Sequence, residues 1–160
     1  MTKQKHIPID ELLALDHQLC FTLHAASRAL TRMYTDRLAE FDVTFPQYLV
    51  LLVLWEWEQS PPERPTMKAL GDRLEMDSST LTAVLHRLAD KDLLTRGRSE
   101  VSARELCVHL TPEGKALKRK IARVPREILK NGHMSLREVV SLRKRLRTFR
   151  ANLGASVAMS

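Results

Sequence analysis

Residues 67–92, MKALGDRLEMDSSTLTAVLHRLADKD, are the stretch that decides the fold. Two runs of apolar residues at helical spacing are separated here by a short polar break, Glu75–Met76–Asp77. Thr66 precedes the first run, and Asp77 or Ser78 begins the second; these are residue types that cap helix N-termini. Two short helices joined by about three residues predict a helix-turn-helix.

A basic β-hairpin is predicted directly after this motif. Residues 93–96 and 106–110 are β-prone, and a polar, basic stretch lies between them. Thr111–Pro112–Glu113 then marks the start of another helix, with proline in the first turn. A helix-turn-helix followed by a hairpin with a long exposed tip predicts a mainly α fold with a small β-hairpin wing, a winged helix-turn-helix.

Amphipathic helices are predicted on both sides of this core. Residues 10–41 repeat apolar side chains at helical spacing, and the helix that begins near Thr44 is almost entirely apolar. Between Val139 and Leu153 the apolar residues alternate in steps of three and four, which is typical of a seam between helices. We interpret the chain as one domain, 1–160, with a winged core at 42–110 and dimerisation helices at 10–41 and 111–153.

Composition limits the possible partners and compartments. The 160 residues include 26 Lys and Arg against 19 Asp and Glu, a net charge of +7, which favours nucleic acid and, second, an acidic membrane surface. No apolar run reaches the ~18 residues of a membrane span, and no signal-peptide core is visible. Two cysteines 87 positions apart form no disulfide framework. We expect a soluble cytoplasmic protein with free thiols, no cofactor and no membrane partner.

The second helix of the motif begins with short hydroxyl side chains, which suit close approach to phosphates and base edges in a DNA major groove. Arginines of the hairpin suit a minor groove, drawn by its negative potential. Each residue alone is as well explained by helix capping or a solvated surface, but the combination favours double-stranded DNA. The predicted DNA contacts are Ser78, Ser79, Thr80, Thr82, His86, Arg87, Arg96, Arg98 and Arg104.

Cys20 lies on the shoulder of the predicted helix 10–41, about 80° from the centre of its apolar stripe, with His24 one turn further on. An imidazolium there would stabilise a thiolate, and exposed thiolates are oxidised by peroxides to sulfenic acid. Packing as a small apolar side chain is an equal alternative. A zinc or copper site of His17, Cys20 and His24 is a weaker one, because the chain lacks a recognisable ligand spacing.

GDRLEMDSSTLTAVLHRLADKDLLTR and VHLTPEGKAL resemble the winged helix-turn-helix core of the MarR family of bacterial repressors, and the resemblance covers about residues 15–150. LDHQLCFTLHAASRALTRMY, TFPQYLVLLVLWE and MKALGDRLEMDSSTLT resemble the organic-hydroperoxide-sensing, OhrR-type branch. The resemblance implies an obligate homodimer on a pseudo-palindromic operator, with Ser78, Ser79, Thr80 and Thr82 in the major groove and Arg104 at the wing tip. One departure is Ser102, where the family usually has an Asp that orients this arginine.

The same resemblance implies that Cys20 is the peroxide sensor, closed in by tyrosines. Tyr34 matches one of these tyrosines, whereas Phe45 and His24 stand where two others are usual. Two-cysteine members of the branch carry a resolving thiol in the C-terminal helices, where this chain has none. We therefore expect Cys107 to be a bystander and oxidised Cys20 to be capped by a small cellular thiol.

The sequence thus predicts a DNA-binding transcriptional regulator, with repression favoured over activation. It would sense organic hydroperoxides by oxidation of Cys20 and then release its operator. The alternative is a MarR-type repressor that responds to a small aromatic ligand or a metal near the first helix, independently of thiol oxidation. A thiol peroxidase, and any enzyme, is disfavoured because the chain has no CxxC motif and no resolving thiol near Cys20.

Overall fold

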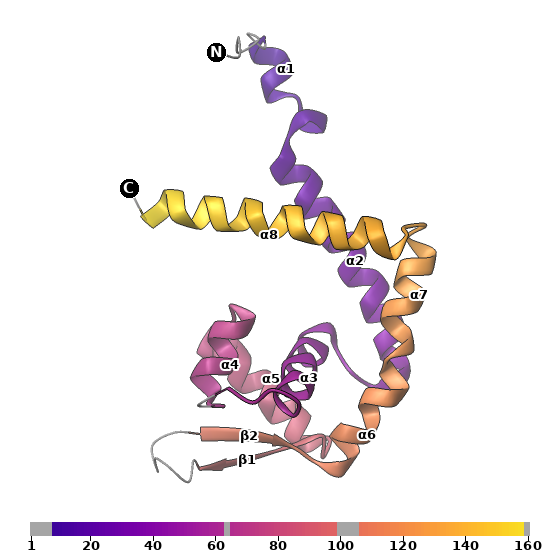
Figure 1. Ribbon diagram of the computed structural model, residues 1–160, viewed down its shortest axis with the longest axis vertical. Helices are drawn as coiled ribbons and strands as arrows, with labels where there is room; N and C mark the ends of the chain where they lie inside the picture. Colours follow the sequence, from indigo (N-terminus) through magenta and orange to yellow (C-terminus); the bar gives the residue numbers. More distant parts are fainter. Residues whose placement is uncertain (1–7, 63–64, 99–105, 159–160) are drawn as a thin grey trace. The chain divides into compact units, whose positions relative to one another are not determined.

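The computed structural model describes residues 8–62, 65–98 and 106–158, and it confirms a mainly helical fold with one antiparallel hairpin (Figure 1). The chain forms two compact units, Met1–Lys118 and Arg119–Ser160, with the boundary inside one helix. The elements in order are α1 (Ile9–Leu13), η1 (Leu15–His17), α2 (Leu19–Leu38), η2 (Ala39–Phe41), α3 (Phe45–Trp57), α4 (Met67–Leu74), α5 (Ser78–Asp90), β1 (Leu94–Arg98), β2 (Leu106–Leu110), α6 (Pro112–Ile121), α7 (Arg123–Asn131) and α8 (Leu136–Ala158).

Helix α3 is the core of the first unit, as its apolar sequence predicts. It starts at a capping box, in which the Thr44 N–H donates to Gln47 Oε1 at 2.9 Å. Helices α4 and α5 and the hairpin pack together around α3 (Figure 1). The side chains that α3 buries are Gln47, Tyr48, Val50, Leu51, Val53, Leu54 and Trp55.

The start of α6 is held tightly against the end of the hairpin. Trp55 Nε1 donates to the Gly114 carbonyl at 2.9 Å. The Thr111 hydroxyl donates to the Asp92 carbonyl at 2.6 Å and accepts from the Gly114 N–H at 3.0 Å. A Cβ at Gly114 would lie 2.0 Å from the backbone oxygen of Leu93. Only glycine fits at this position without moving the backbone.

Gly114→Ala is therefore expected to destabilise the protein by about 2 kcal/mol, because a backbone oxygen cannot rotate away from the added methyl group. Urea unfolding measures the change as a lower midpoint at constant slope. Gly97→Ala is the matched control, since nothing lies within 4 Å of the added Cβ. Equal midpoints for the two variants would contradict the close approach at Gly114.

The prediction of one continuous helix over 10–41 is wrong. Ala14 and Gln18 have extended backbone conformations, which separate α1, η1 and α2. The Gln18 amide donates to the Leu12 carbonyl at 2.6 Å, and His17 Nδ1 donates to the Glu11 carbonyl at 2.9 Å. These side chains satisfy carbonyls that would otherwise require a further helical turn, so they compete with helix continuation.

Apolar side chains of the N-terminal helices and of α8 stay exposed in the single chain. Of the twenty residues of α2, only Leu38 is buried. Within the described ranges, no single helix has the length and apolar character to cross a membrane; one bent pair, Leu19–Phe41 with Phe45–Trp57, meets those criteria jointly. The large exposed apolar residues include Leu12, Leu19, Phe21, Leu30, Leu136, Leu142, Leu146, Phe149 and Leu153. Exposed large apolar side chains that recur along one helix mark an interaction face of that helix.

Candidate functional site

The predicted helix-turn-helix is confirmed in α4 and α5. Thr66 caps α4 by accepting from the Ala69 N–H at 3.2 Å. Glu75 adopts the left-handed conformation, φ 53°, and turns the chain between the helices. A Cβ on Gly71 would lie only 3.2 Å from the Met76 carbonyl oxygen, so a small residue lets the turn close. As predicted, α5 buries Leu81, Val84, Leu85 and Leu88 and leaves its opposite face exposed.

Asp77 organises the first turn of α5. Its Oδ1 accepts from the Ser79 hydroxyl at 2.5 Å and the Thr80 N–H at 2.8 Å, and its Oδ2 accepts from the Thr80 hydroxyl at 2.7 Å. These hydrogen bonds, that from Ser79 first, hold the pKa of the Asp77 carboxyl well below its usual range. From the sequence, Asp77 is predicted only to cap α5. Its hydrogen bonds with the hydroxyls of Ser79 and Thr80 are seen only in the structure.

Asp77→Asn is predicted to lower the melting temperature more at pH 7 than at pH 3. A carboxyl whose pKa falls on folding adds stability above its unfolded-state pKa, and this stability is lost as pH falls through the folded-state pKa. The gap between wild type and variant should therefore narrow below about pH 4. Asp72→Asn, at an exposed acid 3.3 Å from Lys68, should change little at either pH. Equal gaps for Asp77→Asn at both pH values would contradict a role for the charge.

The hydroxyls of α5 differ in what they can offer to DNA. Ser79 and Thr80 donate to Asp77, and the Thr82 hydroxyl donates to the Ser78 carbonyl at 2.7 Å. In this arrangement these three present acceptor lone pairs, which suit the amino groups of adenine and cytosine. The Ser78 hydroxyl makes no hydrogen bond within the described ranges and is therefore free to donate to a phosphate.

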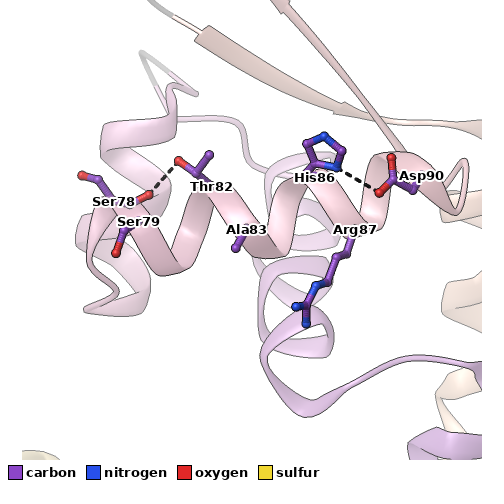
Figure 2. A pocket seen from close by; sticks show the side chains of 7 residues that line it. All are labelled: Ser78, Ser79, Thr82, Ala83, His86, Arg87 and Asp90. Atoms are coloured by element: carbon purple, nitrogen blue, oxygen red, sulfur yellow. Dashed lines mark hydrogen bonds and ion pairs between the residues drawn. The ribbon is translucent and has the colours of Figure 1, made fainter.

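Beyond the hydroxyls, the exposed face of α5 carries a paired histidine and an arginine (Figure 2). His86 Nδ1 lies 2.9 Å from Asp90 Oδ2, and both side chains are exposed. Because a carboxylate only accepts, Nδ1 carries the proton and Nε2 is the ring atom open to a ligand. Arg87 reaches away on another side of the helix. The residues along this shallow hollow are Ser78, Ser79, Thr82, Ala83, His86, Arg87 and Asp90.

The hairpin is confirmed, with Arg96 opposite Val108 and Arg98 opposite Leu106. Arg96 is exposed, and Arg98 is the last residue of β1. The predicted wing-tip contact Arg104, with Ser102 before it, lies outside the described residues.

Cys107 occupies β2, opposite Gly97, and is buried. Strand alternation predicts Cys107 and Val108 on opposite faces, yet both are buried. Strand β2 contacts both α3 and α4, and Cys107 also pairs with Thr66 in an isolated bridge. A buried thiol is shielded from oxidants, and this supports a bystander role.

Cys20 is exposed and is the second residue of α2, not the middle of a long helix. Gln18 precedes the helix without capping it through its side chain, and the first turn contains no acid. In the described part of the chain, no side chain caps the first N–H groups of α2, and the positive end of the helix dipole lies at the turn that carries the thiol. His24, one turn further on, is exposed as well.

Tyr34 and Phe45 do not surround Cys20 within one chain. Fourteen residues separate Tyr34 from Cys20 along α2, a rise of roughly 21 Å. Tyr34 packs instead on Phe45 and Tyr48, with ring centroids 5.5 and 5.6 Å apart. Tyr48 was not among the residues predicted from the sequence, although its i+3 spacing from Phe45 places both on one side of α3.

Both phenols of this aromatic cluster (Tyr34, Phe45 and Tyr48) stay protonated at neutral pH. Burial raises the pKa of Tyr34. Burial, and then the neighbouring Tyr34, raise the pKa of Tyr48 to about 12. Neither phenol donates a hydrogen bond within the part of the chain that the structure describes. The cluster therefore holds two O–H donors suited to an anionic acceptor such as a thiolate.

The structure does not assemble the metal set considered from the sequence. His17 belongs to η1, where its ring binds the Glu11 carbonyl, whereas Cys20 and His24 belong to α2. Among residues 8–62, 65–98 and 106–158, no three His, Cys, Asp or Glu side chains form a group suited to a metal ion.

Comparisons with known proteins agree with this architecture. A family profile described as Transcriptional regulator SarA/Rot matches residues 32–121. The organic hydroperoxide resistance transcriptional regulator of Bacillus subtilis is 40% identical over 136 residues, which cover 85% of this chain and 89% of that protein. The HTH-type transcriptional regulator SarZ of Staphylococcus aureus is 35% identical over 84% of this chain and 88% of that protein.

Solved structures with the same fold include AbfR of Staphylococcus epidermidis. Reduced AbfR bound to DNA is 30% identical, with a TM-score of 0.69 over 90% of this chain and 97% of that chain. Disulfide-formed AbfR is 29% identical, with a TM-score of 0.62 over 92% and 95% of the two chains. The similarity thus covers the winged helix and the flanking helices, and it includes a protein solved in more than one redox state.

Proposed function

Because the chain belongs to the MarR/SarA type of winged-helix transcription regulators, we propose that it is a homodimeric, thiol-based sensor of organic hydroperoxides. Members of this type are DNA-binding transcriptional regulators and not enzymes. The observation that carries the sensor assignment is the contrast between its two thiols. Cys20 is exposed at the open start of α2, whereas Cys107 is buried in β2.

In the DNA-bound state, α5 would lie in the major groove. Ser78 donates to a phosphate, while the acceptor face formed by Ser79, Thr80 and Thr82 meets base amino groups. His86 Nε2 and Arg87 reach the flanking backbone or bases, and the hairpin arginines Arg96, Arg98 and Arg104 enter the adjacent minor groove. Two such units bind a pseudo-palindrome with half-site centres about one helical turn, ~10 bp, apart.

The sensing step is a two-electron oxidation of Cys20. The sulfur attacks the terminal oxygen of the hydroperoxide and the O–O bond breaks. The alkoxide leaves and takes the thiol proton, so that Cys20 becomes a sulfenic acid and the peroxide becomes an alcohol. A small cellular thiol then attacks the sulfenic sulfur, which releases water and leaves a mixed disulfide. Cys107, being buried, takes no part.

The reduced site would be completed by a second copy. Cys20 has no phenol within reach in its own chain, whereas the aromatic cluster has two donors without an acceptor. An antiparallel pairing of the two α2 helices would bring Cys20 to Tyr34 and Tyr48 of the partner subunit. The exposed apolar side chains of α2 support such a pairing, because they need a cover in solution. Oxidation at this contact would change the spacing of the two α5 helices.

The experiment that tests the proposal measures intact-protein mass and operator affinity on the same samples, before and after cumene hydroperoxide. We expect a gain of one oxygen, or of one small thiol when glutathione is present, in step with loss of DNA binding. Peptide mapping should place the added mass on Cys20. Loss of DNA binding with no added mass on Cys20 would contradict thiol sensing while leaving the DNA-binding function intact.

A further inference from the structure

The positive charge of the chain is concentrated in its C-terminal unit. Residues 119–160 contain eleven Lys and Arg against two Asp and Glu, a net charge of +9. Residues 1–118 contain fifteen Lys and Arg against seventeen Asp and Glu, a net charge of −2. The winged core does not account for the charge either, because residues 42–110 have eight basic and eleven acidic side chains. The surplus therefore requires an explanation other than the α5 reading face.

The two acids of the C-terminal unit do not neutralise α8. Glu127 pairs with Arg123 on α7 at 3.5 Å. Glu138 accepts from the Ser135 N–H at 2.8 Å and from its hydroxyl at 2.6 Å, which caps the start of α8. The exposed cations near the middle of α8 make no ion pair within their own unit in its described part; they are Arg143, Lys144, Arg145 and Arg147.

These cations lie beside the apolar seam, not on it. The seam runs through Leu142, Leu146 and Phe149, whereas Arg143 and Arg147 are one turn apart on the adjacent side and Lys144 lies further round. A partner subunit packed on the seam would leave this basic face open. Because each subunit contributes one C-terminal unit, a dimer would carry two such faces.

Acids from a second copy cannot cancel the surplus. The N-terminal segment of α1 and η1 offers three acids, Asp10, Glu11 and Asp16. If one such segment paired fully with a C-terminal unit, the net charge of that unit would fall from +9 to +6. Two such segments would still leave it at +3. A charge of this size on one face attracts a polyanion rather than a single carboxylate. Since the chain is a DNA-binding regulator, duplex DNA is the polyanion that the protein already meets.

We propose that α7 and α8 form a second, sequence-independent DNA-binding surface that holds duplex phosphates through Arg143, Lys144 and Arg147. It acts in addition to α5 and the hairpin, and it does not depend on the thiol. The phosphates belong either to the flanks of the operator duplex or to a second duplex, which the dimer then bridges. In both cases the contacts add affinity and salt dependence without adding base specificity.

The test compares the wild type with R143Q/K144Q/R147Q on operator duplexes with and without 20-bp flanks on each side, which add ~4 helical turns in all. Affinity is measured between 50 and 200 mM salt. Each lost phosphate contact should reduce the slope of log affinity against log salt by about 0.9, so we expect a reduction of roughly 3 when one face is engaged and roughly 5 when both are. Energy transfer between two differently labelled duplexes shows whether the wild type bridges them.

Two controls separate charge from structure. R143K/R147K keeps the charge and should behave as the wild type, and sedimentation should show dimers for all three proteins. Unchanged salt slopes in R143Q/K144Q/R147Q, together with no bridging by the wild type, would overturn the proposal. Loss of the dimer in that variant, or an equally reduced slope in R143K/R147K, would overturn it too. Binding to phosphatidylserine vesicles with unchanged DNA slopes would assign the face to a membrane surface instead. Release of operator by hydroperoxide is measured on the same samples. Absence of release would contradict the thiol mechanism but not this second DNA-binding surface.

Discussion

In hydroperoxide, the wild-type protein is expected to lose about 100-fold in operator affinity, whereas Cys20→Ser is expected to lose none. A 100-fold change corresponds to about 2.8 kcal/mol between the two states. Loss of a charge-assisted hydrogen bond contributes ~1.5–3 kcal/mol, so the thiol contact with phenols of the partner subunit, with some added strain, is sufficient. The packed helices transmit the change because a dense core has discrete arrangements.

Fluorescence anisotropy of labelled operator measures this loss, with reduced protein as the reference. Cys107→Ser is the matched control, since it removes the other thiol and should release DNA as the wild type does. Tyr48→Phe removes one of the two phenol donors and should weaken the response without changing reduced-state affinity. If Cys20→Ser releases operator as readily as the wild type, the sensor assignment is wrong and a ligand-responsive mechanism replaces it.

The reading motif was predictable because its signals are local. Thr66 and Asp77 cap the two helices of the motif as their residue types predict, and Glu75 makes the turn between them. The buried face of α5 follows from the spacing of its leucines. None of these features depends on residues far away in the sequence, so propensity and pattern were sufficient.

The thiol site was predictable only in part, because it depends on distant contacts. The periodicity of residues 10–41 does not reveal that Gln18 and His17 bond back to carbonyls and end a helix there. The pairing of Tyr34 with Tyr48 joins α2 to α3, and spacing within one helix cannot predict it. In the structure, Cys20 therefore lies at the start of a helix, and the aromatic cluster lies far from it within the same chain.

The net charge of the chain indicates a nucleic-acid partner but not which residues carry the charge. The net +7 of the chain favours nucleic acid, but the winged core, residues 42–110, is itself slightly acidic. The DNA contacts that we propose for it therefore depend on a few individual side chains, such as Ser78 and Arg87, more than on an overall positive field. The long-range field comes from residues 119–160, where composition alone assigned no DNA contact.

Replacing Leu146 and Phe149 together by Asp is expected to abolish the dimer and, with it, high-affinity operator binding. These side chains are 39% and 36% exposed in the single chain, although both are large and apolar. Two carboxylates per subunit would have to enter an apolar interface without partners, which costs more than the contact provides. In a dimer, the second winged helix binds its half-site at millimolar effective concentration. Its loss should therefore weaken operator binding by about 10²- to 10⁴-fold.

Sedimentation velocity measures the dimer, and circular dichroism shows whether the monomers remain helical. Ser141→Asp/Thr148→Asp is the matched control, because it adds the same charge to exposed positions on the opposite side of α8. It should remain dimeric, and any change in its operator affinity measures the effect of the added charge alone. A soluble Leu146→Asp/Phe149→Asp protein that still sediments as a dimer would place the interface elsewhere. The pairing of the two α2 helices, which would bring Cys20 to the partner subunit's phenols, would then have to hold the dimer without the α8 seam.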